Sequence, residues 1–456
     1  MSTMTGAADE LAAETPQEKP AGSGEAAPRA WYTVSMLALV IMLAQVDRNV
    51  ISLMVESIKD DFGLSDTEIG YLTGIAFVST YFLLGPPVAR MADRGFRKPV
   101  VCASLAVWSV ATSICGLAQN YWQLFVGRMI VGGAESGSSP ASLSMIADVV
   151  PKAKLPRAYA IYNTGFMAGG AAALFFGGLL MGAFADMDPI PIPGIGVVRD
   201  WQMVFIILGL PGLLVSLVIM LTVPEPQRTA MHKKGGYPLR EVFGFIWANR
   251  RMHIPLLLGS LLNSIQSFGT VAWIPAFYER TFGWGPAVAG PLLGPINMAA
   301  SLLGLFGGAW LAERLGKTRD DANVRTMFLS NFLCIPFIVA GPLMPTPWLA
   351  LGMNALGFSI AAMGGAGYNA ALQISTPNAM RGQINAIYLF IIAAVGGGAG
   401  PLIVGLLTDF VAGAEEDLRY VLAGSRLVLA PIDALLIWLA VRPYGRAVRD
   451  RINAGE

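Results

Sequence analysis

The chain has 456 residues, of which 54% are hydrophobic and only 13% are charged, whereas a soluble domain carries about 25% charged residues. Its mean hydropathy is +0.57, and apolar stretches of about 20 residues, long enough to cross a bilayer, recur from end to end. A soluble protein could not bury so many stretches, so the composition excludes that class. The net charge of +1 does not point to any partner, and we expect no nucleic-acid partner.

The first 30 residues differ from the rest because they are rich in Ala, Gly, Glu and Pro and contain no apolar run. Residues 1–30 are therefore predicted to form a disordered tail. The tail lacks the apolar core of a signal peptide, and the apolar stretch that follows it is too long for one. The three cysteines fall in apolar stretches without ligand spacing, so they predict packing and no metal site.

Apolar segments separated by charged loops predict an all-α membrane protein with twelve transmembrane helices. Their expected ranges are 31–55, 69–88, 99–118, 122–149, 158–183, 202–223, 254–278, 287–311, 325–344, 347–375, 383–408 and 421–441. We expect six-helix bundles at 31–223 and 254–442, a linker at 224–253 and a tail at 443–456.

Positive charge predicts the orientation of these helices. One set of alternate loops, with the C-terminal tail, carries 22 Lys and Arg, whereas the other set carries only 4 among many acids. Cytoplasmic loops are enriched in Lys and Arg. Both termini are therefore predicted to be cytoplasmic, in an integral protein of the cell (inner or plasma) membrane.

The chain also repeats itself across its two halves. A short motif follows the second predicted helix, at residues 89–98, and recurs after the eighth, at residues 309–317. Both copies contain a small residue, an acid followed by Arg, and a later Gly and base. Parallel repeats of this kind occur in secondary transporters. The repeat predicts two pseudo-symmetric halves.

Four ionisable residues lie within predicted membrane helices. Asp47 and Arg48 are adjacent in the first helix, and Arg128 and Glu135 lie seven residues apart in the fourth, on one face. A charge near the bilayer centre costs roughly 3 kcal/mol on insertion scales. Asp47 and Arg128 are expected at similar depth, about 12 and 9 Å below the outer surface, while Arg48 is free to reach Glu135.

The motifs at these positions resemble the major facilitator superfamily. Asp93-Arg94-x-x-Arg97-Lys98 is similar to its cytoplasmic loop signature, and Arg128-x-x-x-Gly132-Gly133-x-Glu135 is similar to its fourth-helix signature. Asp47-Arg48 together with Glu135-Ser136 resembles the spinster branch, whose members are proposed to move sphingolipids and lysolipids. Ala89 and Ala309 depart from the glycine that usually opens the loop signature.

The resemblance implies a cytoplasmic gate, in which loop residues hold the two halves together when the outer side is open. It assigns this role to Asp93, Arg94, Arg97, Glu313 and Arg314. The same basic residues could instead only set topology and bind anionic lipid.

The second half supplies neutral polar residues within its predicted helices, and these are candidates to line a substrate cavity. They are Asn263, Gln266, Asn297, Tyr368 and Asn369. An alternative is that these residues serve helix packing. Asp433, with Arg426 seven residues before it, is the acidic exception, in the last helix. A cavity charged on one wall and apolar on the other suits an amphipathic molecule.

These features predict a proton-coupled secondary transporter that works by alternating access. Burial raises a carboxyl's pKa and a neighbouring Arg lowers it, so Asp47, and next Glu135, could take up a proton when its partner moves away. Arg48 and Arg128 would be charge partners or substrate anchors. The expected substrate is a lipid-like amphipathic molecule or an organic anion. A static ion pair between helices is the alternative reading of the charges.

Other classes of protein fit less well. Gly316-Lys317-Thr318 ends like a phosphate-binding loop but lacks its first glycine, and nothing suggests an enzyme's nucleophile, metal cluster or cofactor. A channel or receptor stays open on topology alone. Within transporters, the alternative is an organic-anion symporter or a drug efflux carrier. We expect a monomer driven by the proton gradient.

Overall fold

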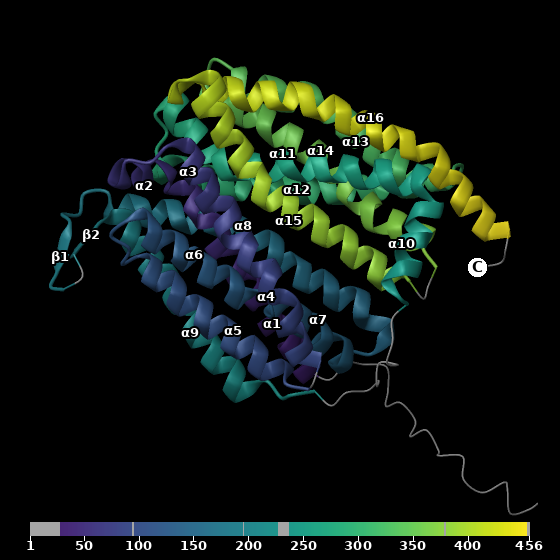
Figure 1. The fold of residues 1–456 in the computed structure, drawn as a ribbon, viewed down its shortest axis with the longest axis horizontal. Coiled ribbons are helices and arrows are strands. Elements are labelled where there is room, and N and C mark those ends of the chain that lie inside the picture. Colours follow the sequence, from purple (N-terminus) through teal and green to yellow (C-terminus); the bar gives the residue numbers. More distant parts are fainter. Residues whose placement is uncertain (1–27, 94, 195, 227–236, 378–379, 454–456) are drawn as a thin grey trace, which may run out of the picture.

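The computed structural model describes residues 28–93, 95–194, 196–226, 237–377 and 380–453. Most of residues 1–30, the predicted tail, therefore lie outside the described part, as does Arg94. Figure 1 shows two bundles of helices side by side, the first built from α1 to α9 and the second from α11 to α16.

The first bundle contains nine helices and one hairpin. Their bounds are α1 (Pro28–Asn49), α2 (Val55–Phe62), α3 (Asp66–Gly70), α4 (Ala76–Asp93), α5 (Arg97–Cys115), α6 (Tyr121–Glu135), α7 (Ser138–Val149), α8 (Leu155–Phe184), β1 (Ile190–Ile192), β2 (Gly196–Val198) and α9 (Asp200–Thr222). The strands β1 and β2 pair antiparallel and project from one end of the molecule (Figure 1).

The linker contributes one short helix, and six long helices form the second bundle. Their bounds are α10 (Leu239–Ala248), α11 (Arg250–Phe282), α12 (Pro286–Gly316), α13 (Ala322–Ala340), α14 (Pro347–Ser375), α15 (Arg381–Leu407) and α16 (Leu418–Asn453). Two π-helical turns, Tyr71–Ile75 and Thr408–Ala412, extend the helices near one end of the bundles.

Eleven helical segments of the described residues are long and apolar enough to cross a membrane. The predicted fourth span, 122–149, was expected as one helix, but it is divided into α6 and α7. Pro140 explains the break, because proline has no N–H to bond the carbonyl four residues earlier, here Ser136, and its ring crowds that carbonyl. Glu135 is thereby the last residue of α6.

Local signals explain the short elements at the end that carries α2 and α3. Gly63 ends α2 with φ of +63°, a conformation that suits glycine. Ser65 begins α3 with a capping box, in which its hydroxyl accepts from the Glu68 backbone N–H and the Glu68 carboxylate accepts from the Ser65 backbone N–H.

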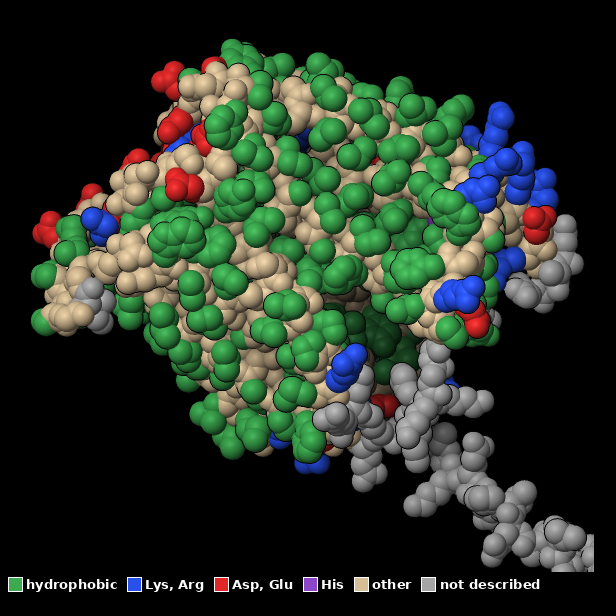
Figure 2. All heavy atoms as spheres, in the orientation of Figure 1, with side chains coloured by type: hydrophobic (Ala, Val, Ile, Leu, Met, Phe, Trp, Pro, Cys, Tyr) green, Lys and Arg blue, Asp and Glu red, His purple; other side chains and the backbone are tan. Residues whose placement is uncertain are grey.

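The charges separate to the two ends of the molecule. Figure 2 shows hydrophobic side chains over most of one face, with acids at the end carrying α2, α3 and the hairpin and most Lys and Arg at the other. We call these the acidic end and the basic end. The face is hollowed between the two bundles near the basic end.

The two bundles meet with the symmetry that the repeat predicts. α8, the fifth spanning segment, packs on α12, the second segment of the other bundle, while α15, the fifth segment of its own bundle, packs on α3 and α4. Near the acidic end these contacts involve glycines. A Cβ on Gly178 would lie 2.6 Å from the Pro286 carbonyl oxygen, and one on Gly74 would lie 2.5 Å from the Gly398 carbonyl oxygen.

We expect Gly178→Val to open the acidic end, because the added side chain cannot fit against α12. Overpacking typically costs about 1–3 kcal/mol, and each 1.4 kcal/mol is about tenfold in an equilibrium. A cysteine introduced at Ser52, on the central cavity, should then react faster with a membrane-impermeant maleimide added at the acidic end. Gly352→Val is the matched control, since a Cβ there meets nothing within 4 Å. An unchanged labelling rate in Gly178→Val would contradict the prediction.

Candidate functional site

The four ionisable residues that the sequence places within membrane helices of the first bundle lie near the ends of α1 and α6. Asp47 and Arg48 lie in the last turn of α1, and Glu135 is the final residue of α6. Arg48 Nη2 lies 2.6 Å from Glu135 Oε1, which confirms the expectation that Arg48 reaches Glu135. Glu135 is 1% exposed, so this is an ion pair within the bundle and does not face lipid.

Arg128 meets Asp47 through the backbone. Arg128 Nη1 donates to the Asp47 carbonyl oxygen at 3.0 Å, while the Asp47 carboxyl lies beside Trp108 and Thr112 of α5. The expected approach of Arg128 to Asp47 is therefore confirmed, although the guanidinium bonds the main chain and not the carboxylate. Asp47 and Arg128 are both buried.

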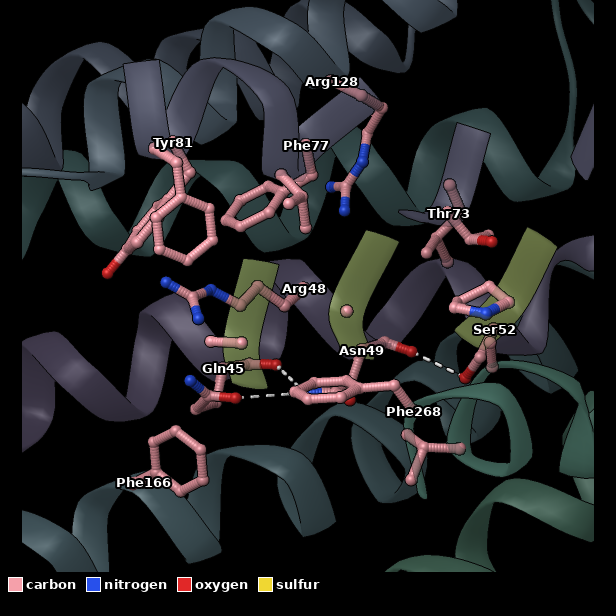
Figure 3. Close-up of a pocket in the computed structure, with 18 residues that line it drawn as sticks. Gln45, Arg48, Asn49, Ser52, Thr73, Phe77, Tyr81, Arg128, Phe166 and Phe268 are labelled. Carbon is pink, nitrogen blue, oxygen red and sulfur yellow. Dashed lines mark hydrogen bonds between the residues drawn. The ribbon is translucent and has the colours of Figure 1, made fainter. Parts of the chain in front are cut away.

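The two arginines border a central cavity between the bundles. Arg48 extends across one wall (Figure 3), with its guanidinium carbon 4.8 Å from the centre of the Phe77 ring and 4.9 Å from that of Tyr81. Cation–π contacts of this kind hold a guanidinium in place without neutralising it.

Polar and apolar residues occupy different parts of this cavity. Gln45 and Asn49 of α1 stand beside Arg48, and Asn49 donates to the Gln45 carbonyl oxygen at 2.7 Å (Figure 3). Ser52, in the 3₁₀ turn that follows, donates to the Asn49 carbonyl oxygen at 2.7 Å. Apolar side chains from both bundles form most of the rest of the lining, to which Thr73 adds a hydroxyl: Ile51, Phe77, Val78, Phe82, Phe166, Phe268, Val271, Ala272, Ala393 and Pro401. Asp47 and Glu135 are not among the lining residues, so the acids lie behind the arginines that form the wall.

The polar residues predicted to line the cavity from the second half are distributed otherwise. Asn263 and Gln266 border a separate cavity inside the second bundle, whereas Asn297 and Tyr368 line neither of these two cavities. The side chain of Asn369 lies outside the described residues. The sequence pattern could identify polar positions within helices but not the direction in which each side chain points.

At the acidic end, ion pairs join the two bundles. Arg280 at the end of α11 contacts Asp66 at 2.7 Å and Glu56 at 2.8 Å, both from the first bundle. Lys59 contacts Asp66 within its own bundle and Glu415 of the other at 2.8 Å. We call these five residues the acidic-end lock. Burial raises the pKa of the Glu56 carboxyl, an effect that the neighbouring Arg280 opposes.

A carboxylate from the second bundle strengthens this closure. Asp409 accepts hydrogen bonds from the backbone N–H groups of Asp66 and Thr67, at 3.2 and 2.7 Å. These are free N–H groups of the first turn of α3, where an anion is favoured by the helix dipole. Sequence reasoning missed the lock. The sequence feature that could have predicted it is the presence of a few basic residues in the otherwise acidic loops, among them Lys59 and Arg280.

The residues predicted to form a cytoplasmic gate are not joined across the bundles here. Arg97 pairs with Asp148 and Glu225 of its own bundle, and Arg314 stacks on Trp310 one turn earlier in its own helix, while Glu313 is exposed. The side chain of Asp93 and all of Arg94 lie outside the described residues. Their gating role therefore stays a prediction, for a conformation that is open at the acidic end.

The fold and these motifs agree with comparisons to known proteins. A family model described as Major Facilitator Superfamily matches residues 37–401. The chain belongs to the major facilitator superfamily. A solved superfamily structure, a bacterial homologue of the human lysosomal transporter Spinster in an inward-facing and unoccupied conformation, superposes with a TM-score of 0.76. It is 26% identical and covers 93% of this chain and 98% of its own.

Two curated relatives differ in how much of their length aligns with this chain. An MFS-type efflux pump of Mycolicibacterium smegmatis is 28% identical over 92% of this chain and 94% of its own length. The protein spinster homolog 1 of Xenopus tropicalis is 23% identical over 67% of this chain, and the match spans only 58% of that relative. The chain is thus a spinster-type superfamily transporter and not an enzyme.

We expect Arg280→Gln to release the acidic-end lock, because Glu56 and Asp66 would lose their shared cation and repel each other. The same cysteine at Ser52 should label several-fold faster from the acidic end than in the parent protein. Arg199→Gln is the matched control, since Arg199 pairs with Asp61 within the first bundle at 2.7 Å. Equal labelling rates for the two variants would show that the lock does not hold the bundles closed.

Proposed function

We propose that this protein is a proton-coupled transporter that carries amphipathic anions by alternating access. The observation that carries the proposal is the Arg48–Glu135 ion pair, with Arg48 on the cavity wall and Glu135 behind it. The Arg48 guanidinium can therefore pair with either of two anionic groups, the Glu135 carboxylate or an anionic group of a substrate in the cavity.

Electrostatics links the two binding events. When Glu135 takes up a proton, its attraction for Arg48 is largely lost, and the guanidinium becomes available to an anion in the cavity. An anion bound to Arg48 in turn weakens the hold of Arg48 on the carboxylate and favours its protonation. Because coupling of this kind is reciprocal, the proton and the anion bind together, as in a symporter.

Asp47 is the proposed proton carrier beside this pair. Asp47 belongs to α1 and is buried against α5. The charges of Glu135 and Arg128 have opposite signs, so they influence the ionisation of its carboxyl group in opposite directions. A change in either neighbour would therefore alter the protonation of Asp47. Access to the cavity would alternate between the two sides of the membrane, because the acidic-end lock and the predicted cytoplasmic gate would close in turn.

The cavity supports an amphipathic substrate. Arg48, Gln45 and Asn49 form a polar patch for a headgroup, and aromatic and aliphatic residues of both bundles offer apolar surface for a tail. Lipid-like anions fit this division, as the spinster resemblance implies. We further propose a monomer in the cell membrane with both termini cytoplasmic, since linker helix α10 and the end of α16 lie at the basic end (Figures 1 and 2).

An organic-anion symporter or drug efflux carrier is the second candidate, favoured by the named efflux pump that aligns along almost the whole chain. Competition distinguishes the two. Lysophosphatidylglycerol, benzoate and ethidium can be compared for their ability to protect a cysteine at Ser52 from labelling. Protection by the lysolipid alone supports the first candidate, whereas protection by benzoate or ethidium alone supports the second.

We expect Asp47→Asn to abolish the pH dependence of transport, because the amide cannot release a proton. The measurement is uptake of fluorescent lysophosphatidylglycerol into proteoliposomes with and without a pH gradient. Asp186→Asn, at an exposed acid outside the helices, should behave as the parent protein. Gradient-driven uptake that persists in Asp47→Asn would remove Asp47 as the carrier.

We expect Glu135→Gln to bind the anionic lysolipid at alkaline pH as tightly as the parent protein does at acidic pH. The amide imitates the protonated carboxyl and leaves Arg48 free in both conditions. Binding can be followed as the shift in melting temperature at several lysolipid concentrations. If the affinity of the variant falls with rising pH as steeply as that of the parent, Glu135 does not control access to Arg48.

A further inference from the structure

A second pair of buried charges lies in the last helix of the second bundle. Asp433 and Arg426 of α16 are 2% and 7% exposed. They are seven residues apart, which places them on one helix face about 10 Å apart along its axis. Unlike Arg48 and Glu135, neither has an oppositely charged partner within 4.0 Å among the described residues.

Each of these charges is held by neutral groups from the same two helices. Asn331 of α13 donates to both oxygens of the Asp433 carboxylate, at 3.0 and 3.1 Å, and Asn263 of α11 donates at 3.3 Å. Arg426 donates to the Ile338 carbonyl oxygen of α13 at 3.0 Å and to the Thr270 hydroxyl of α11. The ionised carboxylate is therefore stabilised by amide donors alone.

Both charges border a small cavity inside the second bundle. The polar groups that face it come from every helix around it. They are Asn263, Gln266, Ser267 and Thr270 of α11, Asn331 and Cys334 of α13, Asn354 of α14, and Arg426 and Asp433 of α16. Only Asp433, Arg426 and Cys334 of these can ionise. Val271 lines this cavity and the central one, so the two adjoin.

The cavity also contains a hydrogen-bond acceptor that is not in use. The Gln266 side-chain oxygen is buried and accepts no hydrogen bond among the described residues. A protonated carboxyl has an O–H to donate, which a carboxylate lacks. The surroundings of Asp433 thus supply donors for its ionised form and an unused acceptor, in the same cavity, for its neutral form.

From this arrangement we infer that Asp433 is a second proton-binding site, in the C-terminal bundle, separate from Asp47 and Glu135. It extends the proposed proton coupling, yet proton binding at Asp433 can be tested without any substrate. A carboxylate that only held helices together would keep one ionisation state. Side chains would pack around it, and it would not border a cavity.

Infrared difference spectroscopy of the full-length protein in liposomes tests the inference. The C=O stretch of protonated carboxyl groups is recorded while the pH is raised from mildly acidic to mildly alkaline. We expect the parent protein to lose several components of this band and Asp433→Asn to lack one of them. The double variant Asp47→Asn, Glu135→Gln should keep that component, so the two sites can succeed or fail independently.

A second variant guards against a folding defect in Asp433→Asn. Asn331→Leu removes a donor that stabilises the ionised carboxylate, so the Asp433 component should persist to higher pH. Asp186→Asn should leave the buried components unchanged. The inference is overturned if Asp433→Asn retains every titrating component of the parent, or if Asn331→Leu leaves their pH midpoints unaltered.

Discussion

An isolated charge is expensive inside a membrane, and the arrangement of the first bundle follows from this constraint. Arg48 and Glu135 can be buried because each supplies the counter-charge of the other at 2.6 Å. The pair also ties the end of α1 to the end of α6, at the point where Pro140 interrupts the predicted fourth helix. A substrate or a proton that separates the pair therefore acts on the contact between two helices.

The closure of the acidic end combines two kinds of contact. Glycines such as Gly178 and Gly74 let the backbones of opposite bundles approach closely, and the acidic-end lock adds charge pairs that depend on the exact positions of Arg280 and Lys59. Close packing alone would resist separation, but charged groups have water as an alternative partner. The end can thus open without leaving buried charges unpaired.

Much of the fold could be predicted from the sequence because the membrane imposes simple rules. Hydropathy located the spanning segments, and the repeat of residues 89–98 at 309–317 indicated two related halves. The break after Glu135 could have been found from Pro140, but long apolar stretches mask a single proline. The spacing of Arg128 and Glu135, the reach of Arg48 and the similar depth of Asp47 and Arg128 correctly placed the four charges near one another.

Tertiary contacts limited what could be predicted about the site. Polar residues such as Asn297 and Tyr368 were expected on the central cavity, yet helix rotation directs them elsewhere, and no periodicity in one apolar helix fixes that rotation. The acidic-end lock joins Glu56 and Asp66 to Arg280, more than 200 residues away. Pairing over such a distance depends on the docking of two bundles, which local sequence does not encode.

The position of Arg48 in front of Glu135 has a consequence for energy conservation. A hydronium ion in the cavity encounters a fixed positive charge before it reaches the carboxylate, and like charges repel. In the proposed mechanism, this repulsion would slow the protonation of Glu135 while the cavity is empty, and an anion that draws the guanidinium aside would speed it. If transport is proton-coupled as proposed, the side chain that pairs with the substrate would thus also limit leakage of protons when no substrate is bound.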